Sequence, residues 1–122
     1  MERLKKHVQD WLNEYANLSD KMDAEFKEYS FTEFITRNSK TLVQQEETFR
    51  HYILLKEILD EEPKKEEVKE YIENTINVFN KRLLTEKLST TTNQMVNLTR
   101  IWQHENLQNL YKQFKSLLSY LN

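Results

Sequence analysis

The chain has 122 residues and a formal net charge of −2, with 38% apolar and 31% charged residues. It contains no glycine, no cysteine and a single proline, Pro63. Glycine is the usual residue where the backbone takes a positive φ, so its absence argues against tight β-hairpins, phosphate-binding loops and nucleophile elbows. A chain of this length buries a single hydrophobic core. The sequence therefore predicts one all-α domain spanning residues 1–122.

The first predicted element is an amphipathic helix whose apolar pattern runs from Leu4 and which ends near Tyr29. Its apolar residues recur at alternating spacings of four and three, which is the pattern of one buried helix face. The residues of this stripe are Leu4, Val8, Trp11, Tyr15, Leu18 and Met22.

A second helix start follows at once. Ser30 and Glu33 have the spacing of a capping box, in which each side chain satisfies a free backbone N–H at a helix N-terminus. The next residues are strongly apolar, but residues 37–40 read Arg-Asn-Ser-Lys and are poor helix formers. This pattern predicts a short extra helix near residues 31–37, followed by a kink or a break.

The apolar pattern resumes at Leu42 and stops just before Pro63. Proline disfavours helical geometry at the preceding residue, so we expect this helix to end there. The next helix is predicted to bury Val68, Ile72, Ile76, Phe79 and Leu83. Residues 85–93 are rich in hydroxyl side chains and predict a loop, and a last helix is expected from about residue 92 to the end. Long helices with short connections favour an antiparallel up-down four-helix bundle.

The sequence holds no recognisable catalytic machinery. There is no cysteine nucleophile, and no serine has an evident base partner, so we expect neither catalysis nor a cofactor. The alternative that stays open is a metal-binding bundle that uses His7, His51 and His104 with nearby carboxylates. Imidazole and carboxylate groups are common metal ligands, and Glu47 shares a helix face with His51.

Charge is unevenly distributed along the chain. Residues 1–79 hold 12 basic and 18 acidic side chains, whereas residues 80–122 hold 6 and 2. The basic residues of the second part are spread out, so we expect no nucleic-acid partner. No run of 18 apolar residues exists and charges occur throughout residues 1–12, so we expect no membrane association and a cytoplasmic location.

Two predicted helices are apolar on two sides when their residues are placed at about 100° per residue. In the last helix, one side carries Val96, Leu107, Leu110, Tyr111, Phe114, Leu117, Leu118 and Leu121, and the other carries Met95, Leu98 and Trp102. In the second long helix, Leu42, Phe49, Tyr52 and Ile53 face one way, Val43, Leu54 and Ile58 the other, and Leu55 lies on the flank. A face that remains apolar must be covered by something.

Two explanations of these second faces remain open. In the first, the second faces are buried within the chain, because the short helix near Phe31 folds over them or because the last helix bends near residues 103–106. In the second, they form an interface for a homodimer or a partner helix. The polar positions around the last helix are mostly uncharged, as in the centre of an interface. We therefore expect a small non-catalytic protein that acts through protein–protein contact, as an adaptor, inhibitor or immunity-type regulator. Its predicted contact residues are Met95, Leu98 and Trp102.

Overall fold

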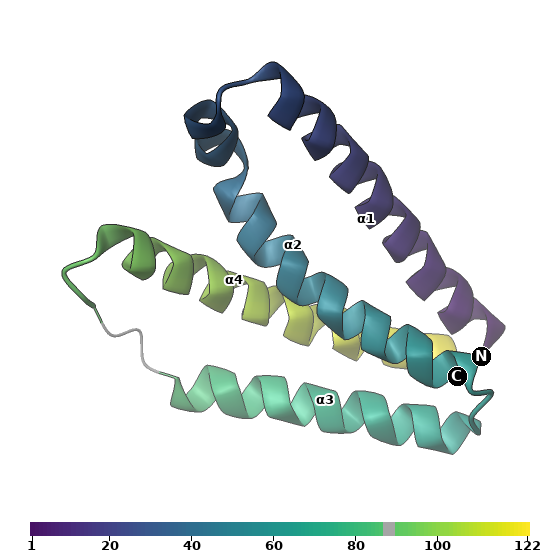
Figure 1. Cartoon of the computed structure of the whole chain (residues 1–122). Coiled ribbons are helices and arrows are strands. Elements are labelled where there is room, and N and C mark those ends of the chain that lie inside the picture. Colours follow the sequence, from purple (N-terminus) through teal and green to yellow (C-terminus); the bar gives the residue numbers. More distant parts are fainter. Residues whose placement is uncertain (87–89) are drawn as a thin grey trace.

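The computed structural model describes residues 1–86 and 90–122, and this part of the chain forms four α-helices, one short 3-10 helix and no strand. The elements are α1 (Glu2–Glu28), α2 (Phe31–Asp60), α3 (Lys65–Thr85), α4 (Gln94–Leu117) and η1 (Leu118–Leu121). Successive helices run in opposite directions, and both termini lie with the α2–α3 connection at one end (Figure 1). The predicted all-α antiparallel four-helix bundle is confirmed.

The short extra helix predicted near residues 31–37 is not a separate element. Ser30 does cap a helix, because its Oγ accepts a hydrogen bond from the backbone N–H of Glu33 at 3.2 Å. That helix is α2, and it continues through residues 37–40 to Asp60. Figure 1 shows the first turns of α2 running in a different direction from the rest. Of the predicted kink or break, the break was wrong, because the helix is continuous, but α2 does change direction after its first turns (Figure 1).

Asn38 explains why α2 does not break. Its side chain is buried, and its Nδ2 donates to the carbonyl oxygen of Phe34 and to Glu25 of α1, each at 3.0 Å. Asparagine lowers helix propensity because its amide competes for backbone hydrogen bonds. Here that amide has one partner within the helix and one on the neighbouring helix. These contacts outweigh the low helix propensity of asparagine, which is all that the sequence pattern shows.

The hydrophobic core lies towards the end of the bundle that holds the termini. It contains Leu4, Val8, Leu12, Tyr52, Leu55, Leu59, Val68, Ile72, Ile76, Phe79, Leu107, Leu110, Phe114, Leu117 and Leu121. The face predicted for α3 is confirmed, with Leu83 packing partly against this core. Angular position alone did not decide burial, because Leu55, placed on a flank of its helix, is fully buried, and Val96, placed on the same side as Leu107, is exposed.

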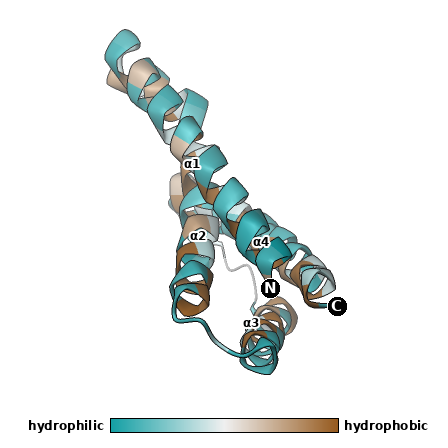
Figure 2. Cartoon of the chain, turned by 90° about the vertical axis from the view of Figure 1, so that its right-hand side faces the viewer, coloured by the Kyte–Doolittle hydropathy of each residue, from teal (hydrophilic) through white to brown (hydrophobic). Residues whose placement is uncertain are grey.

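The far ends of α1 and α2 project beyond the core as a two-helix arm, residues 13–47. Here α1 and α2, of 27 and 30 residues, diverge from α3 and α4 (Figures 1 and 2). At its tip, the Phe26 ring meets Phe31 and Phe34 edge to face, with ring centroids 6.5 and 5.3 Å away. The tip of the arm is thus held by contacts between α1 and α2.

The connection from α3 to α4 corresponds to the loop predicted at residues 85–93, of which residues 87–89 lie outside the described part. The helix α4 starts two residues later than expected. Asn93 caps it, since its Oδ1 accepts from the backbone N–H of Val96 at 3.1 Å.

The connection from α2 to α3 places a glutamate where glycine is usual. Glu62 follows the C-cap residue Glu61 and has φ 53°, the left-handed conformation that often ends a helix. A side chain with a Cβ is disfavoured there by about 1 kcal/mol. We therefore expect Glu62→Gly to raise the free energy of unfolding by about 1 kcal/mol, measured by urea denaturation. Glu61→Gly is the matched control. Glu61 has φ −81°, so the same exchange there should not raise the free energy of unfolding.

Candidate protein-binding surface

The residues predicted to bind a partner lie on the first half of α4. Met95 is 53% exposed, Leu98 is 40% exposed and Trp102 is partly buried, while Ile101 beside them is also exposed. We call these four residues the α4 surface. The structure therefore places the predicted contact residues along an accessible stretch of one helix.

The covers considered for this surface do not account for it. Phe31 and Phe34 pack against Phe26 of α1, so the first turns of α2 do not fold over α4. The helix α4 is continuous from Gln94 to Leu117. Its second half enters the core, but its first half lies beyond the core residues of α3. The exposure of the α4 surface follows from its place near the start of α4 and from its lying opposite the core residues of that helix.

A row of polar contacts, which we call the polar strip, joins α4 to α2 beside this surface. Gln44 donates from Nε2 to the carbonyl oxygen of Trp102 at 3.0 Å and to Glu105 at 3.3 Å, and Lys40 pairs with Glu105 at 3.2 Å. One turn further along α2, the hydroxyl of Thr48 donates to Asn106 at 3.2 Å. Directed bonds of this kind fix which turns of the two helices face each other, so they position the α4 surface.

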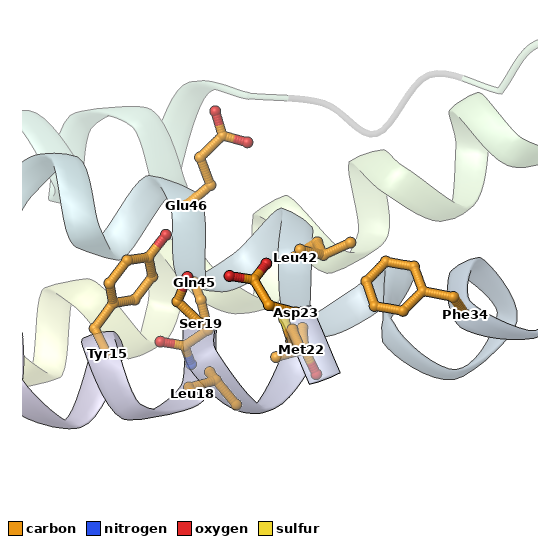
Figure 3. A pocket seen from close by; sticks show the side chains of 10 residues that line it. Tyr15, Leu18, Ser19, Met22, Asp23, Phe34, Leu42, Gln45 and Glu46 are labelled. Carbon is orange, nitrogen blue, oxygen red and sulfur yellow. The ribbon is translucent and has the colours of Figure 1, made fainter. Parts of the chain in front are cut away.

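A second feature, an apolar groove on the arm between α1 and α2, was not predicted. One pocket of about 210 Å³ is lined by Tyr15, Leu18, Ser19, Met22, Asp23, Phe34, Thr41, Leu42, Gln45 and Glu46. An adjoining pocket of about 240 Å³ is lined by Trp11, Glu14, Tyr15, Leu18 and Gln45. Figure 3 shows the side chains of the first pocket converging from both helices. Together the two pockets form what we call the arm groove.

The charges of the arm groove have one sign. Three carboxylates line it, those of Glu14, Asp23 and Glu46, and no lysine or arginine is among the described residues that line either pocket. Glu46 pairs with Arg50 at 2.7 Å, which offsets part of this charge. Asp23 has no hydrogen bond or ion pair within the described part of the chain. The groove therefore combines an apolar floor with a negative rim.

Stacked aromatic rings link the groove to the core. Trp11 stacks on Tyr52 and Tyr15 stacks on Phe49, both with centroids 4.3 Å apart. Burial raises the pKa of Tyr52 to about 12, and its hydroxyl lies 3.3 Å from Gln113. The Tyr52 phenol therefore stays neutral at neutral pH, does not act as a base there, and contributes to packing in the core.

The three histidines do not form the metal site considered as an alternative. His7 stacks on Tyr120 at 4.7 Å, and His51 lies edge-on to Phe79 at 4.9 Å. His104 has a buried Nδ1 without a hydrogen-bond partner. Within the described residues, no group of three or more His, Cys, Asp or Glu side chains lies close enough together to hold a metal ion. The described residues therefore do not bring the three imidazoles together with carboxylates in one metal site.

His51 should make stability depend on pH. Burial lowers its pKa below the ordinary value, Glu47 opposes this, and Arg82 adds to the lowering. The unfolded chain then binds the His51 proton more tightly than the folded protein does, so this contribution to stability is complete above about pH 6.5 and is lost as the pH falls. Urea unfolding at about pH 7 and pH 5 should show a larger loss for the wild type than for His51→Gln. Equal losses would contradict the prediction.

Comparisons with protein-family models, curated proteins and solved structures give no match for this chain. Within residues 1–86 and 90–122, no helix is both long and apolar enough to cross a bilayer. The fold and its surfaces define a four-helix protein with two accessible apolar features, the α4 surface and the arm groove. Periodicity indicated the first of them. The signal for the second was the continuation of the apolar stripe of α1 through Leu18 and Met22.

Proposed function

We propose that this protein is a non-catalytic, cytoplasmic binding module that recognises a protein partner through the α4 surface, as an adaptor, inhibitor or immunity-type regulator does. The observation that carries the proposal is the contrast within α4. Its second half buries Leu107, Leu110 and Phe114 completely, whereas Met95 and Leu98 in its first half stay open to solvent on one continuous helix.

The chemistry of the α4 surface supports contact with protein. Met95, Leu98 and Trp102 are spaced i, i+3 and i+7, which is how an amphipathic helix presents anchors to a groove. Covering a leucine or methionine side chain completely is worth about 1.5 to 3 kcal/mol, so these half-exposed residues would together supply a few kcal/mol. Tryptophan is enriched among the residues that dominate binding energies.

Site-specific photo-crosslinking in cells tests the proposal. A photoreactive amino acid at Leu98 should give adducts with protein, whereas the same amino acid at Val78 should not, although Val78 is an even more exposed apolar residue on α3. Equal adducts at both positions would overturn the proposal, because exposure alone would then explain them.

Trp102→Ala adds the second half of the test. It should reduce the adduct formed at Leu98 while leaving the helix content by circular dichroism nearly unchanged, because Trp102 is only partly buried. If Trp102→Ala unfolds the protein, the indole belongs to the core and the proposal loses its anchor.

A further inference from the structure

We infer that the pocket of about 210 Å³ in the arm groove binds a small organic cation, that is, an ammonium group on a compact apolar body. The site is separate from the proposed function, because it lies between α1 and α2 and uses none of the four residues of the α4 surface. Its size, its unused hydrogen-bonding groups and its charge support this class of ligand.

The helices α1 and α2 touch at both ends of this pocket. At one end, Tyr15 of α1 stacks on Phe49 of α2 with centroids 4.3 Å apart. At the other end, Phe34 of α2 meets Phe26 of α1 edge to face at 5.3 Å. Tyr15 and Phe26 are about 16 Å apart along α1. A pocket closed at both ends has no room for a long helix lying along it, and this favours a small molecule.

The volume of the pocket suits a ligand with one aromatic ring. An apolar cavity of about 150 Å³ holds a benzene molecule, so a volume of about 210 Å³ leaves room for a ring and a few further atoms. The apolar lining comes from both helices, with Leu18 and Met22 on α1 and Phe34 and Leu42 on α2. Removing the ring from water against this lining supplies the main favourable contribution to binding.

Five polar side chains line the same pocket, and none of these side chains makes a hydrogen bond within the part of the chain that the structure describes. They are Tyr15, Ser19, Asp23, Thr41 and Gln45. Elsewhere in the helices, threonine hydroxyls such as those of Thr75 and Thr99 bond to the carbonyl oxygen four residues earlier. An ammonium group donates three hydrogen bonds, and each of the five side chains can accept one.

The charge of the pocket selects a cation. Asp23 and Glu46 line it, and no lysine or arginine does so among the described residues. Glu46 already pairs with Arg50, and in Figure 3 its carboxylate points away from the other labelled side chains. Asp23 has no partner in the described ranges, and Lys27, one turn further along α1, makes no ion pair with it. Asp23 is therefore the carboxylate that the ammonium group of a ligand would pair with.

Titration of the isotope-labelled full chain by nuclear magnetic resonance tests the inference, with benzylamine as the probe. Benzylamine should shift the backbone signals around Met22 and Leu42, with a dissociation constant in the millimolar range that suits so small a ligand. Benzyl alcohol has nearly the same shape without the charge and should bind about fivefold more weakly. Equal binding of the two probes, or no shift of the pocket signals by benzylamine, overturns the inference.

Two variants, whose folding is checked by circular dichroism, locate the charge that matters. Asp23→Asn keeps the shape of the side chain and removes its charge, so it should weaken benzylamine binding about fivefold and leave benzyl alcohol binding unchanged. Asp20→Asn is the matched control, because Asp20 lies on the same helix but does not line the pocket, and it should change neither. If both substitutions weaken benzylamine equally, the net charge of the arm attracts the cation and the inference is wrong.

Two further measurements separate this ligand from other occupants of the pocket. N-acetyllysine methylamide presents an ammonium group as a protein side chain does. If it binds more tightly than benzylamine, the occupant is a lysine of a partner protein and the assignment to a small molecule is overturned. If light scattering shows a dimer that Asp23→Asn weakens, the pocket lies between two copies of the chain, and the inference fails for that reason instead.

Discussion

Replacing Phe114 with alanine should lower the free energy of unfolding by about 4 kcal/mol. The Phe114 side chain has no exposed surface, and its ring meets Phe79 and Tyr52 edge to face with centroids 5.4 and 5.9 Å away. It therefore joins residues of three helices at the centre of the core. Removing it leaves a cavity that surrounding helices can close only in part.

Phe31→Ala is the matched control for this prediction, because the chemical change is identical. Phe31 is 69% exposed and has one ring neighbour, Phe26. Its replacement should cost less than about 1 kcal/mol. Urea denaturation followed by circular dichroism measures both variants. Similar losses would mean that the core is not centred on Phe114.

Asn106→Leu should raise the free energy of unfolding by about 1 to 2 kcal/mol. Asn106 is buried, and its Nδ2 has no hydrogen-bond partner within the described residues. Its Oδ1 accepts from Thr48, but that hydroxyl also donates to the carbonyl oxygen of Gln44 at 3.1 Å. Leucine removes the unsatisfied amide, and Thr48 keeps a partner.

Asn106→Asp provides the contrast in the same denaturation experiment. It keeps the shape and the acceptor for Thr48 but adds a buried charge, so it should destabilise the protein at neutral pH. Destabilisation by Asn106→Leu as well would show that the polar strip contributes more than its unpaired amide costs. Stabilisation by Asn106→Leu together with destabilisation by Asn106→Asp would instead show that the unpaired amide costs more than the polar strip contributes.

The sequence pattern predicted the helices well, but it predicted less well which of their apolar residues are buried against neighbouring helices. Repeated apolar spacing fixes which angular face of a helix is apolar, and this was enough for α3, where Val68 through Phe79 form one buried row. The pattern cannot tell where along its axis a helix loses its neighbours. Val96 and Leu107 fall on the same predicted side of α4, yet only Leu107 lies beside the core.

The candidate site shows the same limit. Met95 and Leu98 were found from the sequence because they lie opposite the core stripe of their own helix. The arm groove was missed because Leu18 and Met22 continue the α1 stripe that supplies Leu4 and Val8 to the core. The later turns of α1 lie where α1 and α2 diverge from α3 and α4 (Figure 1), so the same stripe leaves the core there. The angle at which helices diverge is a tertiary property.

The chain termini lie at one end of the bundle with the α2–α3 connection, whereas α4 begins at the opposite end (Figure 1). The 24 residues of α4 separate its first turn from that end by about 36 Å. A tag, surface anchor or second domain fused to either terminus is therefore held away from Met95 and Leu98. Immobilised by either terminus, the protein would present the start of α4 outward, ready for capture from solution.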